Sequence, residues 1–377
     1  MKLSHLLGLC FFFGLSACQS TDSSNMNAAY KSALIATEKW GEIDGQDVNL
    51  YTLQNKNGMQ LQLSNYGALI VKALVPDRNG EFADVALGYP TLEDYQRERA
   101  GMGAVIGRYH NRIRNGQFEL EGEQYQVTLN EGENSIHAGF EYQRALWTAL
   151  AITTDNGPGL QLTYVSPDGS HGFPGEVRTT LTYVLTEDNA IDLRFEAGAD
   201  RPTPLNYIQH AYFNLNGVSD TVLKHVVSID ADTHAAYDSS ALQTGRIESL
   251  RGEAFDLIEP TEIGAHLDEI ALGGYHQTYI LNKKDGELKT IASIWDPESG
   301  RTMDVSTTSP TMTFYVSMGL NNSVPGKYGI EYAPFKGFCM ETGFIPDSVN
   351  YPHLPSTIFG PDRRYDERVI YRFGVKP

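Results

Sequence analysis

The stretch of sequence that decides the fold is Val177–Glu196, VRTTLTYVLTEDNAIDLRFE. In its second part, Ile191–Glu196, apolar and charged side chains alternate at every step, as they do in a strand with one buried face. In its first part, every second residue from Val177 to Leu185 marks one face of another strand. A repeat of two rather than 3.6 residues predicts β-strands and excludes amphipathic helices here.

The same pattern extends outward over most of the chain. Comparable short apolar runs lie at residues 61–63, 69–75, 146–153, 160–165, 291–295 and 311–316. Turn-forming residues separate them, as in Pro76–Gly80 and Pro167–Gly169, and the one helical stretch is short, near Leu92–Arg99. Strands without intervening helices favour an antiparallel sandwich or barrel. Because no mid-chain linker is evident, we expect an all-β protein in which residues 39–377 form one large antiparallel β-sandwich domain.

Composition excludes several classes of function. The 377 residues include 29 basic and 47 acidic side chains, a formal charge of −18. Nucleic-acid binding and polybasic adhesion to an anionic membrane both need the opposite balance. Hydrophobic residues make up 41% of the chain, which is enough for a packed core. Three cysteines are too few for a disulfide-stapled scaffold and lack a zinc-type spacing, so we predict no metal site.

The N-terminus has the features of an export signal over residues 1–17. Lys2 precedes a nearly unbroken apolar run, Leu6–Leu15, that is too short to span a bilayer as a helix. The run ends in Leu15-Ser16-Ala17-Cys18, which resembles the bacterial lipobox, where the cysteine is lipidated and the signal is cut just before it. The alternative is an ordinary secretory signal cleaved after Ala17, with Cys18 incidental.

We expect lipidation of Cys18, with residues 18–38 forming the lipidated cysteine and a flexible polar tether. Gln19 follows instead of the aspartate that retains enterobacterial lipoproteins at the inner membrane, so we expect an outer-membrane anchor facing the periplasm. Contact with the membrane would be through the lipid alone. Cys339 then has no partner for an internal disulfide and is expected in the core.

Four polar clusters stand out against the strand pattern. Gly107–Ile113 contains two arginines, an asparagine and a histidine, and Asn134–Phe140 places a histidine in a turn. His210–Leu215 joins a histidine to aromatic residues, and Glu341 follows an apolar strand, where a carboxyl group can have a raised pKa. Taken singly, each has a structural explanation, because lone histidines and arginines are more often hydrogen-bonded structural residues than catalysts.

Taken together, the clusters resemble one family. The order Asn111-Arg112, His137, His210-Ala211-Tyr212 and Glu341 is similar to that of the aldose 1-epimerases, or galactose mutarotases. The resemblance runs from about Gly41 to Phe373. Further matching blocks are Asn65-Tyr66-Gly67-Ala68, Pro76–Gly80, Tyr212-Phe213-Asn214-Leu215 and Glu341-Thr342 followed by Pro346-Asp347-Ser348. The resemblance implies a large twisted antiparallel β-sandwich, the galactose mutarotase-like supersandwich.

The resemblance also implies a reaction, the exchange of α and β anomers of a free hexose or pentose, without a cofactor. Glu341 would be the general base that takes the C1 hydroxyl proton, and His210 the general acid that protonates the ring oxygen, one on each side of the anomeric centre. His137, Arg112 and Asn111 would bind sugar oxygens, and Tyr212 would form a sugar-facing wall.

Several positions depart from the family pattern. His276 stands where the family has a sugar-binding aspartate, Gln277 follows it, and Thr313 replaces a glutamine. The usual His-Gly-Gly is His137-Ala138-Gly139, and Glu-Thr-Gln ends in Gly343. A carboxylate accepts hydrogen bonds from two hydroxyls, whereas a neutral imidazole has one acceptor. We therefore expect His276 to contact the substrate and the preferred sugar to differ from galactose or glucose, unless nearby residues compensate.

Other functions stay open from the sequence. One is a sugar-binding lipoprotein with weak or no catalysis. Another is a carbohydrate-cleaving enzyme on a related supersandwich, although a glycosidase needs two carboxylates and Glu341 has no evident acidic partner. A sugar-phosphate epimerase is a further option, in which Arg108 and Arg112 would supply local positive charge. The sequence fixes neither the sugar nor the oligomeric state.

Overall fold

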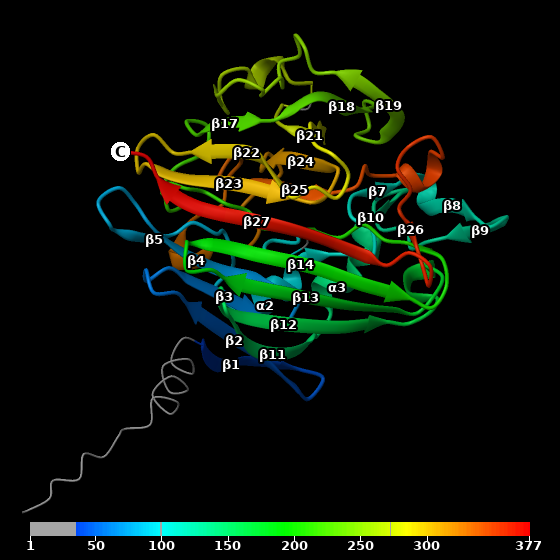
Figure 1. Ribbon diagram of the computed structural model, residues 1–377, viewed down its shortest axis with the longest axis horizontal. Coiled ribbons are helices and arrows are strands. Elements are labelled where there is room, and N and C mark those ends of the chain that lie inside the picture. The colour runs from blue at the N-terminus through cyan, green and yellow to red at the C-terminus, as the bar shows by residue number, and fades with distance from the viewer. Residues whose placement is uncertain (1–34, 99, 272) are drawn as a thin grey trace, which may run out of the picture.

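The computed structural model describes residues 35–98, 100–271 and 273–377, which are built almost entirely of β-strands (Figure 1). The expected signal segment, Cys18 and the tether as far as residue 34 lie outside the described residues. The first strand, β1 (Ile35–Ile43), begins before the boundary expected at residue 39. Residues 35–38 pair with residues 50–53 of β2 (Gln46–Gln54), so they belong to the sandwich rather than to the tether.

The stretch that decided the fold forms two adjacent antiparallel strands, as predicted. β13 (Val177–Leu185) pairs with β14 (Ala190–Ala199) in a register that runs from Val177 opposite Ala199 to Leu185 opposite Ile191. The side chains predicted for the inner face of the two strands are buried, both on β13, from Val177 to Leu185, and on β14, from Ile191 to Phe195. The alternation of the sequence therefore corresponds to one face in the core and one face in solvent.

Three large sheets make up the domain, and every pairing between the named strands is antiparallel in the part of the chain that is described. The nine-stranded sheet has the order β11 (Thr148–Thr154), β12 (Gly157–Ser166), β13, β14, β27 (Tyr365–Val375), β23 (Arg301–Thr307), β22 (Lys289–Trp295), β17 (Val226–Ile229), β20 (Thr261–Glu262). One five-stranded sheet has the order β1, β2, β3 (Gln60–Ser64), β4 (Ile70–Pro76), β5 (Phe82–Asp84). The other has the order β19 (Gln243–Ser249), β18 (Ala231–Tyr237), β21 (His276–Leu281), β24 (Thr311–Val316), β25 (Phe338–Gly343).

Four short ribbons and a few helical turns complete the domain. The ribbons are β10 (Ser135–Ile136) with β7 (Arg112–Ile113), β15 (Thr203–Pro204) with β26 (Ile358–Phe359), β16 (Ile208–Gln209) with β6 (Val105–Ile106), and β8 (Gln117–Leu120) with β9 (Glu123–Gln126). The α-helices of the described residues are α2 (Leu92–Arg97) and α3 (Glu141–Arg144), and the 3-10 turns are η1 (Arg114–Gly116), η2 (His137–Phe140), η3 (Ser170–Gly172), η4 (Leu267–Glu269), η5 (Lys327–Gly329) and η6 (Ser348–Asn350). The predicted helix near Leu92–Arg99 is confirmed as α2, where the Thr91 hydroxyl accepts the Asp94 backbone N–H as an N-cap.

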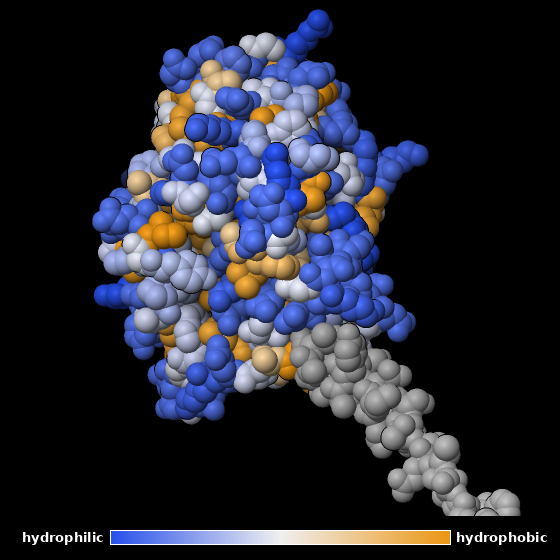
Figure 2. Space-filling view, turned by 90° about the vertical axis from the view of Figure 1, so that its left-hand side faces the viewer, coloured by the Kyte–Doolittle hydropathy of each residue, from blue (hydrophilic) through white to orange (hydrophobic). Residues whose placement is uncertain are grey.

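One large hydrophobic core joins the sheets. It contains side chains from β3 and β4, from β12 to β14, and from β22 to β25. One side of the molecule shows hydrophobic residues scattered among hydrophilic ones rather than gathered in a single patch (Figure 2). Within the described residues, no helix has the length and apolar character needed to cross a membrane.

Candidate active site

A cavity of about 520 Å³ opens where β7, β10, β21, β24 and β25 approach one another. Its lining includes every residue that the sequence predicted for catalysis or substrate binding: Asn111, Arg112, His137, His210, Tyr212, His276 and Glu341. Thr313, one of the departures from the family pattern, also lines it. These residues come from segments more than two hundred positions apart, so the fold brings together what the sequence only suggested.

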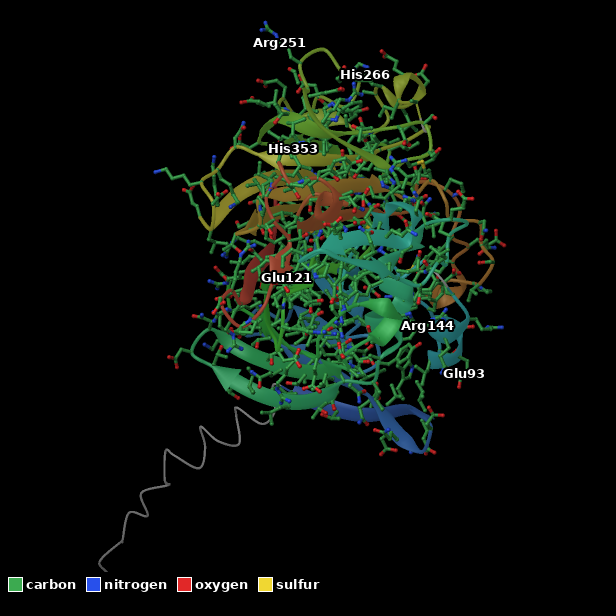
Figure 3. All side chains as sticks on the ribbon, turned by 90° about the vertical axis from the view of Figure 1, so that its right-hand side faces the viewer. Glu93, Glu121, Arg144, Arg251, His266 and His353 are labelled. Carbon is green, nitrogen blue, oxygen red and sulfur yellow. The ribbon has the colours of Figure 1, made fainter. Side chains whose placement is uncertain are left out.

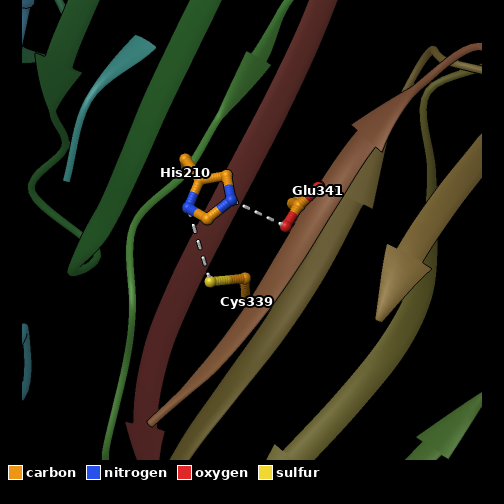
Figure 4. A group of neighbouring side chains, drawn as sticks. All are labelled: His210, Cys339 and Glu341. Atoms are coloured by element: carbon orange, nitrogen blue, oxygen red, sulfur yellow. Dashed lines mark hydrogen bonds and ion pairs between the residues drawn. The ribbon is translucent and has the colours of Figure 1, made fainter. Parts of the chain in front are cut away.

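Glu341 and His210 are buried and lie side by side in this site (Figure 4). Glu341 lies on β25 opposite Thr313 of β24, and its Oε1 is 3.3 Å from His210 Nε2. The backbone of His210 follows β16 and is held by Ala104 and Gly103, whose carbonyl and N–H it bonds at 2.8 and 3.0 Å. The side chains of His210 and Glu341 are 7% and 4% exposed, so their interaction is shielded from bulk water.

Burial sets the protonation of this pair. It raises the pKa of Glu341 from 4.5 to about 8 and lowers the pKa of His210 from 6.5 to about 4. Because the two groups are in contact, they titrate as a unit rather than one by one. Between about pH 4 and pH 8 the pair therefore holds one proton, which the order of the two pKa values places on Glu341.

Cys339 lies two residues before Glu341 on the same strand, and it is buried and free, as predicted. Its Sγ is 3.9 Å from His210 Nδ1. A sulfur, an imidazole nitrogen and a carboxylate oxygen of Cys339, His210 and Glu341 lie within 4.8 Å of one another, a spacing that a metal ion could bridge. A metal requires the thiolate, however, and burial next to Glu341 raises the pKa of Cys339 well above its ordinary value. The chemistry of this group fits a thiol that packs against the histidine.

His110 is a residue of the site that the sequence did not single out. Its Nδ1 is 4.0 Å from Glu341 Oε2, and its Nε2 is 3.3 Å from the carbonyl oxygen of Phe344. Since a carbonyl only accepts, Nε2 must be the donor, and Nδ1 of the neutral ring is an acceptor facing the carboxyl group. Glu341 thus has an imidazole beside each of its two oxygens. The signal was available, because His110 stands inside the Gly107–Ile113 cluster.

Asn111 organises the opposite part of the cavity from a left-handed backbone conformation, with φ of 59°. Its backbone N–H donates to His137 Nδ1 at 3.2 Å, and its Oδ1 accepts the Arg112 backbone N–H at 2.8 Å. Its Nδ2 lies 3.4 Å from His276 Nε2. The ribbon of β7 with β10 pairs Arg112 with Ile136, which places His137 beside this turn.

Arg112 is held by a partner that sequence reasoning missed. Its Nε and Nη2 donate to the two oxygens of Glu131 at 2.6 and 2.7 Å, a fork-like arrangement that fixes the guanidinium plane. Nothing in the sequence signals this pair, because Arg112 lies on β7 and Glu131 in the segment before β10, and the two meet only after the ribbon forms. Arg108, by contrast, is fully buried and bonds Ser166, Pro167 and Pro174, so it does not line the cavity.

Aromatic rings close the sides of the cavity. The Tyr212 ring centroid is 5.1 Å from that of His210, and His276 lies 5.7 Å from Tyr315 and 5.6 Å from Tyr237 by the same measure. Apolar ring faces beside convergent polar groups are typical of sites that bind small polar molecules. A buried carboxyl group with a raised pKa, next to an imidazole, is the arrangement expected for proton transfer to and from such a molecule.

Comparison with known proteins places the chain in a class and then in a family. Solved structures with the same fold include a galactose 1-epimerase from Lactobacillus acidophilus, with a TM-score of 0.81 and 25% identity over 91% of this chain and 99% of that one. An aldose epimerase homologue from C. elegans has a TM-score of 0.80 and 26% identity over 88% of this chain and 100% of that one. These likenesses confirm the predicted class, an antiparallel β-sandwich of the galactose mutarotase type.

The sequence relatives fix the family. The aldose 1-epimerase family model matches residues 49–372. The galactose mutarotase of Bos taurus is 36% identical over 87% of this chain and 94% of its own length, and the aldose 1-epimerase of Escherichia coli is 33% identical over 88% and 96%. The chain belongs to the aldose 1-epimerase family.

Proposed function

We propose that this chain is an isomerase that interconverts the α and β anomers of a free aldose, with Glu341 as general base and His210 as general acid. Membership of the aldose 1-epimerase family supports the reaction. The observation that carries the residue roles is the buried contact of 3.3 Å between Glu341 Oε1 and His210 Nε2 in a cavity lined by groups that bind sugar oxygens.

The geometry of the pair suits the reaction. The C1 hydroxyl oxygen and the ring oxygen are bonded to the same carbon, so the base and the acid that serve them must lie near each other. The side chains of Glu341 and His210 lie 3.3 Å apart, so both can reach one anomeric centre, on whose opposite sides the sequence led us to expect them. Adjacent placement lets one sugar carbon face both groups at once.

The reaction then proceeds in two balanced halves. Glu341 takes the proton of the C1 hydroxyl as His210 gives a proton to the ring oxygen, and the bond between C1 and the ring oxygen breaks to leave an open-chain aldehyde. Rotation about the C1–C2 bond presents the other face of the carbonyl group. His210 then takes the proton of the attacking hydroxyl and Glu341 returns one to the carbonyl oxygen, which regenerates both groups.

Sugar binding must also transfer the proton that the pair holds in the free protein from Glu341 to His210. Before binding, the order of pKa values places it on Glu341. A sugar hydroxyl that donates to Glu341 stabilises the carboxylate and lowers its pKa, so the proton passes to His210 across the contact between the two side chains. The His137 ring, whose centroid is 5.5 Å from that of His210, is close enough to contact the same sugar.

We expect the chain to accelerate anomer exchange of aldoses with a bell-shaped dependence of kcat/KM on pH. The pair is competent when it holds one proton, so activity should fall below about pH 4, where both groups are protonated, and above about pH 8, where neither is. Exchange NMR on glucose, galactose, xylose, arabinose and fucose, repeated across pH, measures both properties.

The same measurement separates this function from its main rival. A pure sugar-binding protein would perturb the sugar resonances without speeding exchange, and that result would contradict the proposal. Release of new reducing ends from oligosaccharides would indicate a cleaving enzyme instead. Glu131, the other carboxylate that lines the cavity, binds Arg112 with both oxygens, which leaves it poorly placed to act as the second carboxylate of a glycosidase.

We also propose that the chain is an exported lipoprotein, anchored in the outer membrane by Cys18 and facing the periplasm. The support is the apolar run that ends in Leu15-Ser16-Ala17-Cys18, followed by Gln19. We expect the wild-type chain in the outer-membrane fraction and the detergent phase of a Triton X-114 partition, and Cys18→Ser outside both. Wild-type chain found wholly in the soluble periplasmic fraction would favour ordinary cleavage after Ala17.

A further inference from the structure

The hydrogen positions of the cavity wall formed by Asn111, Arg112, His137 and His276 follow from its contacts. The Arg112 backbone N–H can only donate, so the Asn111 atom that it reaches at 2.8 Å is the amide oxygen. The other end of the amide is therefore the NH₂ group, which donates to His276 Nε2 at 3.4 Å. A neutral imidazole has one hydrogen, so that of His276 is on Nδ1.

The same reasoning applies to His137. Its Nδ1 accepts the Asn111 backbone N–H at 3.2 Å, so the hydrogen of its neutral ring is on Nε2. Burial lowers the pKa of both histidines below the ordinary value of 6.5, which keeps the rings neutral near pH 7. Arg112 uses Nε and Nη2 for Glu131, and its Nη1 adds a further donor to this wall. The wall therefore presents N–H groups.

The oxygens around this wall already take part in hydrogen bonds within the protein, although each keeps some accepting capacity. The two oxygens of Glu131 accept from Arg112, and Oδ1 of Asn130 accepts the Ile136 N–H at 2.8 Å. Thr313 Oγ1 lies 2.7 Å from Thr278 Oγ1, which in turn lies 2.6 Å from the Tyr237 hydroxyl. A sugar hydroxyl placed here would find several N–H donors for its oxygen and fewer acceptors for its own hydrogen, chiefly the carboxylate of Glu131.

A carboxylate matches the wall better than a hydroxyl group. It has no hydrogen to place and can accept from several donors at once. Glu131 already neutralises the guanidinium of Arg112, so the wall would hold the carboxylate by hydrogen bonds from its N–H groups rather than by an unpaired positive charge. An aspartate in place of His276, as the family pattern has, would favour a hydroxyl group over a carboxylate, because it accepts from hydroxyls and repels an anion.

We propose, on the basis of the proposed anomer exchange, that the preferred substrate is an acidic aldose of the hexuronate class, whose carboxylate accepts from His276 and Arg112. His276 and Glu341 are close enough to contact the same sugar molecule at its two ends. Glu341 on β25 pairs with Thr313 of β24, and Thr313 pairs with Thr278 of β21, so His276 lies two strands away and two residues before Thr278. Two strand spacings and two residues along the strand separate the backbones by about 12 Å, which the two side chains and a hexose between them can bridge.

The net charge of the chain does not oppose this assignment within the cavity. A formal charge of −18 slows the approach of an anion. Charges on the outer surface are screened beyond about 8 Å at physiological ionic strength, however. Affinity depends on the wall itself, where Arg112 is the one arginine or lysine that lines the cavity among the described residues and where its charge is paired with that of Glu131.

Matched pairs of sugars test the proposal. Galacturonate with galactose, and glucuronate with glucose, differ only in whether C6 is a carboxylate or a hydroxymethyl group. At pH 7 we expect exchange NMR to give a kcat/KM at least about tenfold higher for each uronate, as one charge-assisted hydrogen bond of about 1.5 kcal/mol would produce.

Two variants of nearly equal shape separate hydrogen-bond donation from packing. His276→Asn keeps N–H donors and should retain the preference for uronates, whereas His276→Asp should lose it and rank the neutral hexoses first. His266, which is exposed (Figure 3) and does not line the cavity, provides the matched control as His266→Asp, which should leave the ranking unchanged. Thermal melting of both His276 variants checks that each folds.

Failure of this inference differs from failure of the proposed function. Exchange of galactose and glucose that is as fast as that of their uronates would overturn the substrate class and leave the isomerase intact. An equal ranking for His276→Asp and His276→Asn would also overturn it. Absence of acceleration for all four sugars and for the five neutral aldoses would contradict the isomerase itself.

Discussion

Glu341→Gln should lower kcat by about 10²–10⁴-fold, the usual contribution of a positioned proton-transfer group, and should raise the melting temperature. The amide has the same shape as the carboxyl group and can still donate to His210, which lies 3.3 Å away, so the packing of β25 is preserved. It cannot take a proton from the sugar.

The stability change follows from the sign of the pKa shift. Burial raises the pKa of Glu341 from 4.5 to about 8, so the folded protein retains a proton that the unfolded chain releases above about pH 4.5. The carboxyl group therefore costs the folded state progressively more stability as the pH rises from about 4.5 to about 8. Glutamine has no such proton, and its advantage in melting temperature should be larger at pH 8 than at pH 5.

Polarimetry of freshly dissolved α-glucose or α-galacturonate and thermal melting at the two pH values measure these effects. Glu93→Gln is the matched control, because Glu93 is exposed on α2 (Figure 3) and does not line the cavity. An inactive Glu341→Gln with a lower melting temperature would point to a structural role, and one with wild-type exchange would remove Glu341 as the base.

His210→Asn should also lower kcat by about 10²–10⁴-fold, with KM changed much less. Asparagine can donate a hydrogen bond to Glu341, but it cannot carry the proton to the ring oxygen and back. Because the two groups exchange one proton as a unit, the double variant Glu341→Gln/His210→Asn should be about as slow as the slower single variant rather than slower by the product of both losses.

Exchange NMR on the single variants and the double variant measures this coupling. His266→Asn serves as the control for replacement of a histidine, since the His266 side chain is 49% exposed and bonds Glu269 rather than a cavity residue. Losses that multiply in the double variant would mean that Glu341 and His210 act independently, which the contact between them does not support.

Much of the fold was predictable from local pattern. The alternation in Val177–Glu196 predicted β13 and β14, because burial of one face of a strand imposes a period of two on the sequence. The start of the domain was not predictable in the same way. Residues 35–38 lie mostly exposed on β1, so they carry little apolar signal, and only their pairing with β2 reveals them as strand.

The residues of the site also fall into those that the sequence could predict and those that only the folded contacts reveal. Asn111, His210 and Glu341 could be proposed because they belong to short motifs whose order is visible in the chain. Glu131 could not, because its role depends on a contact with Arg112 that exists only after β7 and β10 pair. The tautomers of His137 and His276 were equally hidden, since the first depends on a contact with the Asn111 backbone N–H and the second on which end of the Asn111 side-chain amide faces His276.

Glu341 lies in the middle of β25, so the position of the proposed base depends on the folding of the whole sandwich. On that strand, Phe338 and Met340 belong to the main hydrophobic core, and its backbone is paired with β24 from Thr311 to Val316. A base carried on a surface loop could fray while the rest of the domain stayed folded. Here the carboxyl group leaves its place only when the sheet comes apart, so inactivation by heat or denaturant and collapse of the sandwich are a single cooperative event.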